Sequence, residues 1–298
     1  MLVKDRFGKE VDNLRLAVTG RCNLACFFCH HEGYTPNICS AGAGKEMSPG
    51  EIRTVVEVAA GQGINRVKLT GGEPLLREDL GQIIKEVGAV AGIGEVSLVT
   101  NGVLLEERVG DLEGVSRINV SIHTTQPNIY RKITGRDLHG KVLKGIEATV
   151  KAGLPVKLNM TVLKGLNEDE VEGMVELAKR MGTDLQLIEY HSPEMDGGKF
   201  VNLDKVEKWL DENSEKKSEL KDNRRKRFEV KGVKVHLVRP MFNREFCENC
   251  HRMRVTPDGK FKPCLMREDN HVEFDVMSRE SVEKAFGEAI KRKEPFFR

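Results

Sequence analysis

The chain has 298 residues, with 48 basic and 46 acidic side chains and a formal net charge of +2 at pH 7. This near-balance argues against a protein that binds nucleic acid through its overall charge. The sequence contains no run of 18 or more apolar residues, so we expect no transmembrane helix. Its first ten residues lack the apolar stretch of a secretory signal, and we therefore expect a cytoplasmic protein.

Through the first two-thirds of the chain, short β-rich runs alternate with helical patterns. The expected strands are residues 14–18, 66–69, 96–100, 118–122, 156–162 and 185–189. The expected helices are residues 48–61, 77–90, 103–112, 139–152, 168–181 and 202–213. The first helix begins with a capping-box pattern, in which Ser48 is followed by Pro49 and, three residues after the cap, by Glu51.

Six strand–helix units in succession predict an α/β fold with a parallel sheet, because parallel strands need crossover connections. The pattern fits a doubly wound sheet or an open barrel with fewer than eight units. In both architectures ligands gather at the C-terminal ends of the strands.

The pattern changes after Leu210. Residues 211–227 are almost wholly polar, which favours a solvated connector over a basic binding patch at residues 224–227. Residues 228–238 then predict a hairpin that turns at Lys231-Gly232, and a further helix is expected from about residue 278 to 291. We therefore predict two parts, a core of residues 1–220 and a smaller C-terminal region of residues 221–298.

Six of the seven cysteines fall into two triplets, and Cys39 stands apart as an ordinary small residue. In a reducing compartment, clustered cysteines more often bind metal or perform chemistry than form disulfides. Cys22, Cys26 and Cys29 lie within eight residues directly after the first expected strand. A [4Fe–4S] cluster held by three cysteines keeps one iron open for a ligand. The alternative is a zinc site completed by His30 or His31, although zinc sites usually pair their cysteines as C-x2-C.

Other strand ends carry motifs that suit a bound ligand. Lys68 opens the run Lys-Leu-Thr-Gly-Gly-Glu-Pro at the end of the second strand. Gly71 and Gly72 would allow close backbone approach, and the Glu73 carboxylate could accept hydrogen bonds from an ammonium group. Thr100 and Ser121 end the third and fourth strands.

The second triplet consists of Cys247, Cys250 and Cys264, with an expected hairpin turn at residues 257–259. A zinc knuckle completed by His251 is one interpretation, but His251 directly follows Cys250, which makes joint ligation of one ion awkward. A second three-cysteine cluster is the other. Arg252 and Arg254 flank it, and arginine suits bidentate binding of phosphate, so an anionic ligand is expected there.

The C-x3-C-x2-C spacing is the signature of the radical-SAM superfamily, and the chain further resembles the GTP 3′,8-cyclase family of molybdenum cofactor biosynthesis. The matching stretches are residues 14–29, 68–80, 118–135, 156–169, 188–190 and 246–265. The resemblance implies a partial (βα)6 parallel barrel of the radical-SAM type with a smaller C-terminal Fe–S-binding subdomain. It also implies two [4Fe–4S] clusters and S-adenosylmethionine (SAM) as cofactors.

In that family a SAM-derived 5′-deoxyadenosyl radical removes the ribose 3′ hydrogen of GTP, and the new carbon radical attacks C8 of guanine. The product is (8S)-3′,8-cyclo-7,8-dihydroguanosine 5′-triphosphate. The resemblance also implies an electron donor such as flavodoxin or ferredoxin, a downstream cyclic pyranopterin monophosphate synthase, and a homodimer. No membrane or nucleic-acid partner is expected.

Site residues follow from the same resemblance by motif position. The cluster ligands would be Cys22, Cys26, Cys29, Cys247, Cys250 and Cys264. The SAM contacts would be Phe28, Gly71, Gly72, Glu73 and Ser121. The GTP contacts would be Arg15, Lys68, Thr100, Lys157, Arg252, Met253 and Arg254.

Three departures from the family pattern stand out. The chain ends in Pro-Phe-Phe-Arg rather than in a Gly-Gly tail, His251 replaces the usual asparagine, and His191 stands where methionine is common. Two rival interpretations remain: another radical-SAM enzyme with an auxiliary cluster, such as a peptide maturase, and a non-enzymatic zinc or Fe–S module that binds nucleic acid through residues 224–227.

Overall fold

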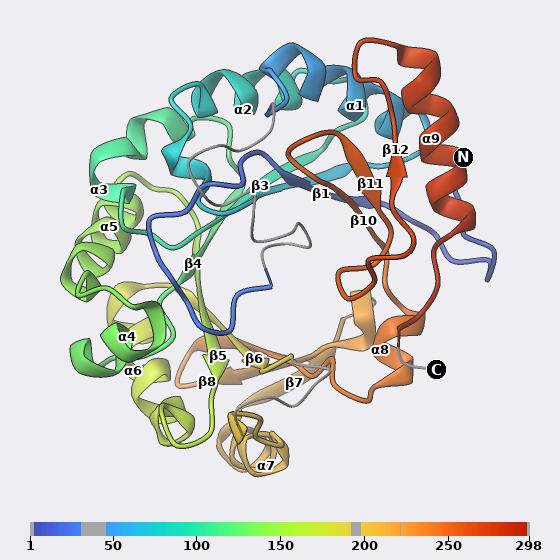
Figure 1. The fold of residues 1–298 in the computed structure, drawn as a ribbon. Helices are drawn as coiled ribbons and strands as arrows, with labels where there is room; N and C mark the ends of the chain where they lie inside the picture. Colours follow the sequence, from blue (N-terminus) through green and yellow to red (C-terminus); the bar gives the residue numbers. More distant parts are fainter. Residues whose placement is uncertain (1–2, 31–45, 192–197, 221, 297–298) are drawn as a thin grey trace.

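The computed structural model describes residues 3–30, 46–191, 198–220 and 222–296. Its strands curve into an open barrel, and helices line the outside of that barrel (Figure 1). Within the described residues the strands form one sheet in the order β12-β11-β10-β1-β2-β3-β4-β5-β6-β9-β8-β7.

The first six strands form the parallel centre of this sheet, which confirms the predicted partial (βα)6 barrel. Each pairs with the next along the chain in parallel. Their bounds lie close to the predicted ones: β1 is Asn13–Ala17, β2 Arg66–Thr70, β3 Glu95–Thr100, β4 Arg117–Ser121, β5 Val156–Val162 and β6 Asp184–Glu189.

The C-terminal third of the chain extends the sheet at both of its edges. On one side β10 pairs in parallel with β1, and β11 and β12 follow it antiparallel. On the other side β9 pairs in parallel with β6, and β8 and β7 follow it antiparallel. These strands are β7 Lys216–Glu219, β8 Lys226–Val230, β9 Val233–Val238, β10 Arg252–Val255, β11 Lys260–Lys262 and β12 Val272–Glu273.

The prediction of a solvated connector over residues 211–227 was wrong. Residues 216–219 pair antiparallel with β8 as the edge strand β7, although all four side chains are exposed, as their polarity requires. The predicted hairpin that follows is confirmed as β8 and β9. Its two turn residues, Lys231 and Gly232, have φ values of 51° and 80°, which match the right-handed twist of the flanking strands.

The helices are α1 Pro49–Gly61, α2 Leu80–Gly88, α3 Leu105–Arg108, α4 Pro127–Thr134, α5 His139–Lys151, α6 Val171–Met181, α7 Asp204–Asn213, α8 Arg244–Glu248 and α9 Arg279–Lys291. The predicted capping box is present, because the Ser48 hydroxyl accepts from Glu51 N and the Glu51 carboxylate accepts from Ser48 N. The sequence analysis did not predict α4 or α8. No helix in the described part of the chain is both long and apolar enough to cross a bilayer.

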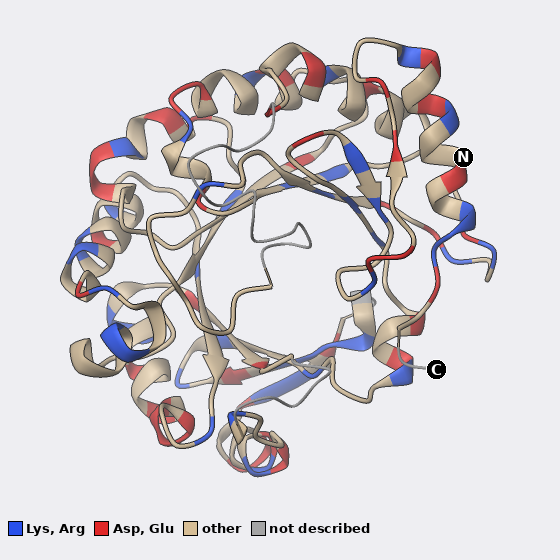
Figure 2. Cartoon of the chain, in the orientation of Figure 1, with Lys and Arg blue, Asp and Glu red and all other residues tan. Residues whose placement is uncertain are grey.

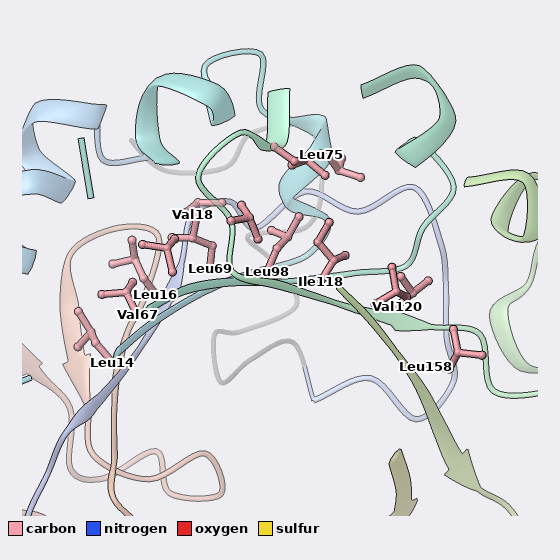
Figure 3. Close-up of a cluster of buried hydrophobic side chains, with 14 of the residues drawn as sticks. Leu14, Leu16, Val18, Val67, Leu69, Leu75, Leu98, Ile118, Val120 and Leu158 are labelled. Carbon is pink, nitrogen blue, oxygen red and sulfur yellow. The ribbon is translucent and has the colours of Figure 1, made fainter. Parts of the chain in front are cut away.

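The hydrophobic core lies between the outer face of the sheet and the surrounding helices (Figure 3). Along β1, Leu14 and Leu16 point outward and are fully buried, and Leu69 and Leu98 continue this layer on the next strands. Burying a leucine side chain contributes about 1.5–3 kcal/mol. Because neighbouring residues on a strand face opposite ways, the alternate positions project into the barrel.

Asn167 joins the loops that follow β4 and β5. Its side-chain amide nitrogen donates to the carbonyl oxygens of His123 at 2.7 Å and Thr161 at 2.9 Å, and its oxygen accepts from Leu163 N at 2.7 Å. The residue is 1% exposed, so water cannot replace these contacts.

We predict that Asn167→Ala lowers the free energy of unfolding by about 2–3 kcal/mol, because it leaves buried backbone groups without partners. Urea unfolding followed by circular dichroism measures this change. Asn213 is the matched control: its side chain bonds an exposed carbonyl of the same helix. Asn213→Ala should alter the free energy by less than about 0.5 kcal/mol. Equal effects of the two substitutions would contradict a bridging role for Asn167.

Candidate active site

A cavity of about 1300 Å³ occupies the interior of the barrel. The inner-face side chains of the strands line it, together with the loops at their C-terminal ends and the last described residues of the chain. All six cysteines of the two triplets line this one cavity. The structure therefore brings together two motifs that the sequence separates by more than two hundred residues.

The first triplet lies on the loop after β1. This loop is anchored to the end of α4, because Ala25 N donates to Thr134 O at 2.9 Å and Phe27 N donates to Ile133 O at 3.4 Å. Cys22 and Cys29 are exposed, and Cys26 is half-buried. Burial, together with the neighbouring Cys29 and Cys22, raises the pKa of the Cys26 thiol to about 12.

This thiol set fits an iron–sulfur cluster. The mutual repulsion of three nearby thiolates is what a bound cationic cluster would relieve. A [4Fe–4S] cluster binds each cysteine through a different iron, so the three sulfur atoms need not meet at one point as the ligand atoms of a zinc ion must. His31 and Cys39 lie outside the described residues.

Gly71 and Gly72 fit the cysteine loop against the loop after β2, and both line the cavity. A Cβ atom on Gly71 would lie 2.4 Å from the carbonyl oxygen of Thr19, and one on Gly72 would lie 2.1 Å from that of Arg21. Gly72 N also donates to Thr19 O at 2.8 Å. The predicted close approach at these glycines is therefore a contact between their backbone and the backbone of the cysteine loop.

Glu73 does not line the cavity. Its carboxylate is 0% exposed and accepts three hydrogen bonds, from Leu75 N at 3.0 Å, the Thr100 hydroxyl at 2.7 Å and Asn101 N at 2.7 Å. It thus connects the loops after β2 and β3. Burial raises the pKa of Glu73, and these hydrogen bonds oppose that rise. Asn101 joins these two loops to the cysteine loop, because its side chain donates to Asn23 Oδ1 at 2.7 Å.

Aromatic side chains surround Phe28, which precedes Cys29. The Phe28 ring meets the His123 ring edge-on at a centroid distance of 5.0 Å, and the Tyr190 ring lies 6.3 Å away. His123 has a φ of 66°, and its Nδ1 accepts from Thr161 N at 3.1 Å. Burial lowers the pKa of His123 to about 4, so this ring is neutral at pH 7. Sequence analysis missed His123; its only signal was its place two residues after Ser121.

Several strands of the barrel carry Lys and Arg residues, drawn as blue segments in Figure 2. Those that line the cavity are here called the cationic wall. Arg254, Arg15 and Lys68 are register partners on β10, β1 and β2. Ser97 of β3 links this row to Arg117 of β4. The full set of cavity-lining cations on or beside the strands is Arg15, Arg66, Lys68, Arg117, Lys157, Arg225, Arg227, Arg252 and Arg254.

These cations repel one another. Burial, with the positive charges of Arg15 and Arg117, holds the pKa of Lys68 well below its ordinary value. Burial and Arg117 likewise lower the pKa of Lys157 to about 7, although Asp184 opposes that shift. The pKa of His236 falls to about 3 through burial and the nearby Lys157. The cavity is therefore electrostatically prepared for an anion of several charges.

The second triplet lies beside β10. Cys247 is in α8, whose N-cap Asn243 accepts from Phe246 N at 2.9 Å, and Cys250 N donates to Cys247 O at 3.2 Å. Burial alone would raise the pKa of Cys250, but the charges of Lys293, Arg252 and Arg254 outweigh it and lower the pKa to about 6. A thiol that ionises this readily suits a metal ligand.

The three predicted GTP contacts on β10 do not all face the same side of the sheet. Arg252 and Arg254 face the cavity, whereas the Met253 side chain between them is 0% exposed and packs in the hydrophobic core. Strand alternation dictates this result, and the Met253 side chain does not reach the cavity. Thr100 and Ser121 do line it, as do Phe28, Gly71 and Gly72.

The C-terminal segment also reaches the cavity. Lys293, Glu294, Pro295 and Phe296 line it. Glu294 is held by ion pairs with Arg6 and with Arg267, the latter at 2.7 Å.

Comparison with known proteins places the chain in a family. Residues 16–178 match the family model of the radical SAM superfamily, and residues 183–297 match that of molybdenum cofactor synthesis C. The chain is 42% identical to a probable GTP 3′,8-cyclase of Methanosarcina acetivorans, over 99% of this chain and 90% of that protein. It is also 42% identical to a probable GTP 3′,8-cyclase of Thermococcus kodakarensis, over 100% of both chains.

Solved structures share the fold at low identity. Streptococcus suis SuiB bound to S-adenosylmethionine has a TM-score of 0.63 at 14% identity, covering 87% of this chain and 62% of that chain. The enzyme anSMEcpe with bound AdoMet has a TM-score of 0.64 at 16% identity, covering 93% of this chain and 79% of that chain. The family models and the two relatives at 42% identity show that the chain belongs to the radical SAM superfamily and, within it, to the GTP 3′,8-cyclase family.

Proposed function

We propose that this protein is a GTP 3′,8-cyclase, which converts GTP into (8S)-3′,8-cyclo-7,8-dihydroguanosine 5′-triphosphate in the first step of molybdenum cofactor biosynthesis. The observation that carries this conclusion is the shared cavity, in which both cysteine triplets and the cationic wall meet. A nucleoside triphosphate has the charge that such a wall requires. Two relatives at 42% identity, covered over 90% and 100% of their length, are named probable GTP 3′,8-cyclase.

In this proposal the six cysteines hold two [4Fe–4S] clusters, and SAM binds beside the first triplet. Bound there, the cluster and SAM would supply the one-electron chemistry that opens the reaction. Phe28, Gly71, Gly72 and Ser121 would contact SAM. Glu73 would act indirectly, by fixing the loops after β2 and β3.

GTP would lie against the other side chains of the cavity. Arg252 and Arg254 would hold it beside the second triplet, and Arg15, Lys68 and Lys157 would bind its phosphates, with Thr100 at the strand end. Met253 would contribute by packing β10 against β1 rather than by contact. Enclosure within the barrel would keep water away from a reactive radical.

The peptide-maturase alternative has less physical support. A peptide substrate places no demand for several converging cations, whereas this cavity has lysines whose pKa values are lowered by burial and by neighbouring arginines. The solved structures that contain a bound peptide share only the fold with this chain, at under 20% sequence identity. We also propose residues 1–220 as the SAM-binding core and residues 221–298 as the auxiliary-cluster and GTP region.

We also propose where the protein acts and which partners it has. We place the protein in the cytoplasm, with a small electron donor such as flavodoxin or ferredoxin. A downstream cyclic pyranopterin monophosphate synthase would take up the product, and a homodimer is the proposed assembly. Electron entry would be easiest near the first triplet, where Cys22, Cys29 and Phe27 are exposed.

The direct test is anaerobic incubation of the cluster-reconstituted protein with SAM, dithionite and GTP, followed by mass spectrometry. We expect 5′-deoxyadenosine in amounts that depend on GTP, together with a GTP isomer that carries a new ribose–base bond. Cleaved SAM with unchanged GTP would refute GTP as the substrate.

Cys22→Ala should abolish SAM cleavage, because the remaining two thiols cannot hold a cluster with an open iron. Cys264→Ala is the matched control in the second triplet, and it should retain uncoupled SAM cleavage while losing GTP conversion. Liquid chromatography of 5′-deoxyadenosine measures both effects. Substantial 5′-deoxyadenosine from Cys22→Ala would contradict the assignment of the first triplet.

Arg252→Ala should weaken GTP binding by about 1.5–3 kcal/mol, roughly ten- to a hundred-fold, because a charge-assisted contact is lost. Reductive SAM cleavage should remain. Isothermal titration calorimetry under anaerobic conditions measures the affinity, and Arg244→Ala, on the exposed face of α8, is the control. Unchanged GTP affinity would remove Arg252 from the site.

GTP binding should take up a proton above pH 7. Lys157 has a pKa of about 7 in the free protein, and a bound triphosphate would raise it. Below pH 7 Lys157 is charged in both states, so affinity is flat; above it, affinity falls as pH rises because binding must first protonate the amine. Calorimetry in buffers of different ionisation enthalpy reports the proton uptake. Lys157→Met should abolish the proton uptake. The same uptake in that variant as in the wild type would show that Lys157 is not the group that takes up the proton.

A further inference from the structure

One group of cavity-lining residues comes from the β8–β9 hairpin and is not covered by the family motifs. Gln186 of β6, His236 of β9 and Arg227 of β8 are register partners across three neighbouring strands. All three line the cavity. Since residues paired across a sheet face the same side, they form one continuous polar row.

Arg225 adds a second charge directly before β8. Its Nη1 donates to Gln186 Oε1 at 3.4 Å, and it lines the cavity. Lys68 of β2 and Lys157 of β5 line the same cavity, so Arg225 shares with them the space that the curved sheet encloses. Burial is the main cause of the lowered pKa values of these two lysines, and the charge of Arg225 adds to it.

Lys157, which lies in the cationic wall, is 5% exposed. His236 is a buried side chain of this region with an unsatisfied ring nitrogen. It is 7% exposed, and its Nδ1 has no hydrogen-bond partner among the described residues. Buried polar groups of this kind carry a free-energy penalty that a bound hydrogen-bonding anion would remove.

The edge strand β7 holds part of the arrangement in place. Arg227 Nε donates to the hydroxyl of Ser218, its register partner on β7, at 3.0 Å. Lys226, between the two arginines, faces the other way and forms an ion pair with Glu207 of α7. The hairpin therefore directs alternate cations inward and outward.

We propose that Arg225, Arg227 and His236, here termed the hairpin anion subsite, bind the polyphosphate of the substrate and complete the wall begun by Lys68 and Lys157. This inference rests on the proposed function for the identity of the nucleotide. Its physical basis is the convergence of three cavity-lining groups, two of which, Arg227 and His236, are fixed in place by strand pairing. The subsite would favour nucleotides by their phosphate charge and would leave SAM binding unaffected.

The test compares Arg225→Gln and Arg227→Gln with Lys226→Gln in the anaerobic, cluster-reconstituted protein. Calorimetry without reductant measures the affinities for GTP, for inorganic tripolyphosphate and for SAM. Each inward arginine variant should bind GTP and tripolyphosphate about ten- to a hundred-fold more weakly. The Lys226 variant should change both by less than about threefold, and SAM affinity should stay constant in all three. Arg227→Lys keeps the charge but loses the guanidinium fork, so its loss should be smaller than that of Arg227→Gln.

The outcomes separate this inference from the proposed function. If the wild type binds GTP and neither arginine variant weakens it, the subsite is refuted and the cyclase proposal stands. A loss for GTP without a loss for tripolyphosphate would also refute phosphate recognition by these residues. If the wild type binds tripolyphosphate but not GTP, and the arginine variants weaken that binding, the subsite stands and the nucleotide assignment fails. Unchanged SAM affinity shows that each variant has folded.

Discussion

Side-chain alternation along the parallel strands is the constraint on which the rest of this structure depends. Leu14 and Leu16 of β1 pack outward against helices, while Arg15 between them faces the cavity. The same backbone therefore supplies both the hydrophobic core and the chemical site. The outer layer stabilises the fold strongly enough to hold an inner layer of neighbouring cations, among which burial first and the nearby arginines second lower the pKa of Lys68.

Much of the fold could be predicted from sequence because local signals agree with it. The six central strands and the capping box at Ser48 were found from periodicity and cap chemistry. The edge strand β7 was missed because Lys216–Glu219 has no apolar face, and its pairing with β8 alone makes it a strand. Helix α4 was missed because it is short, and its role in anchoring the cysteine loop arises only in three dimensions.

The candidate site was predictable where chemistry is concentrated in a motif and not where it is dispersed. Cysteine spacing indicated both triplets, and resemblance supplied Arg252. Arg225 and Arg227 lay within a polar run that resembled a solvated connector, since nothing local tells an inward-facing arginine from an outward-facing one. Met253 shows the opposite case. It lies between two site residues in the motif, but strand alternation points its side chain into the core.

The pairing of β1 with β10 joins an early strand of the chain to a late one, and it thereby couples the two cysteine triplets. Backbone N–H groups of Asp12 and Asn13 both donate to His251 O at 3.2 Å, next to Cys250. The loop that follows β1 carries the first triplet and bonds to the end of α4 through Ala25 and Phe27. A single strand thus sets the spacing between the two sets of thiols, and a register shift of β1 would misplace both of them at once.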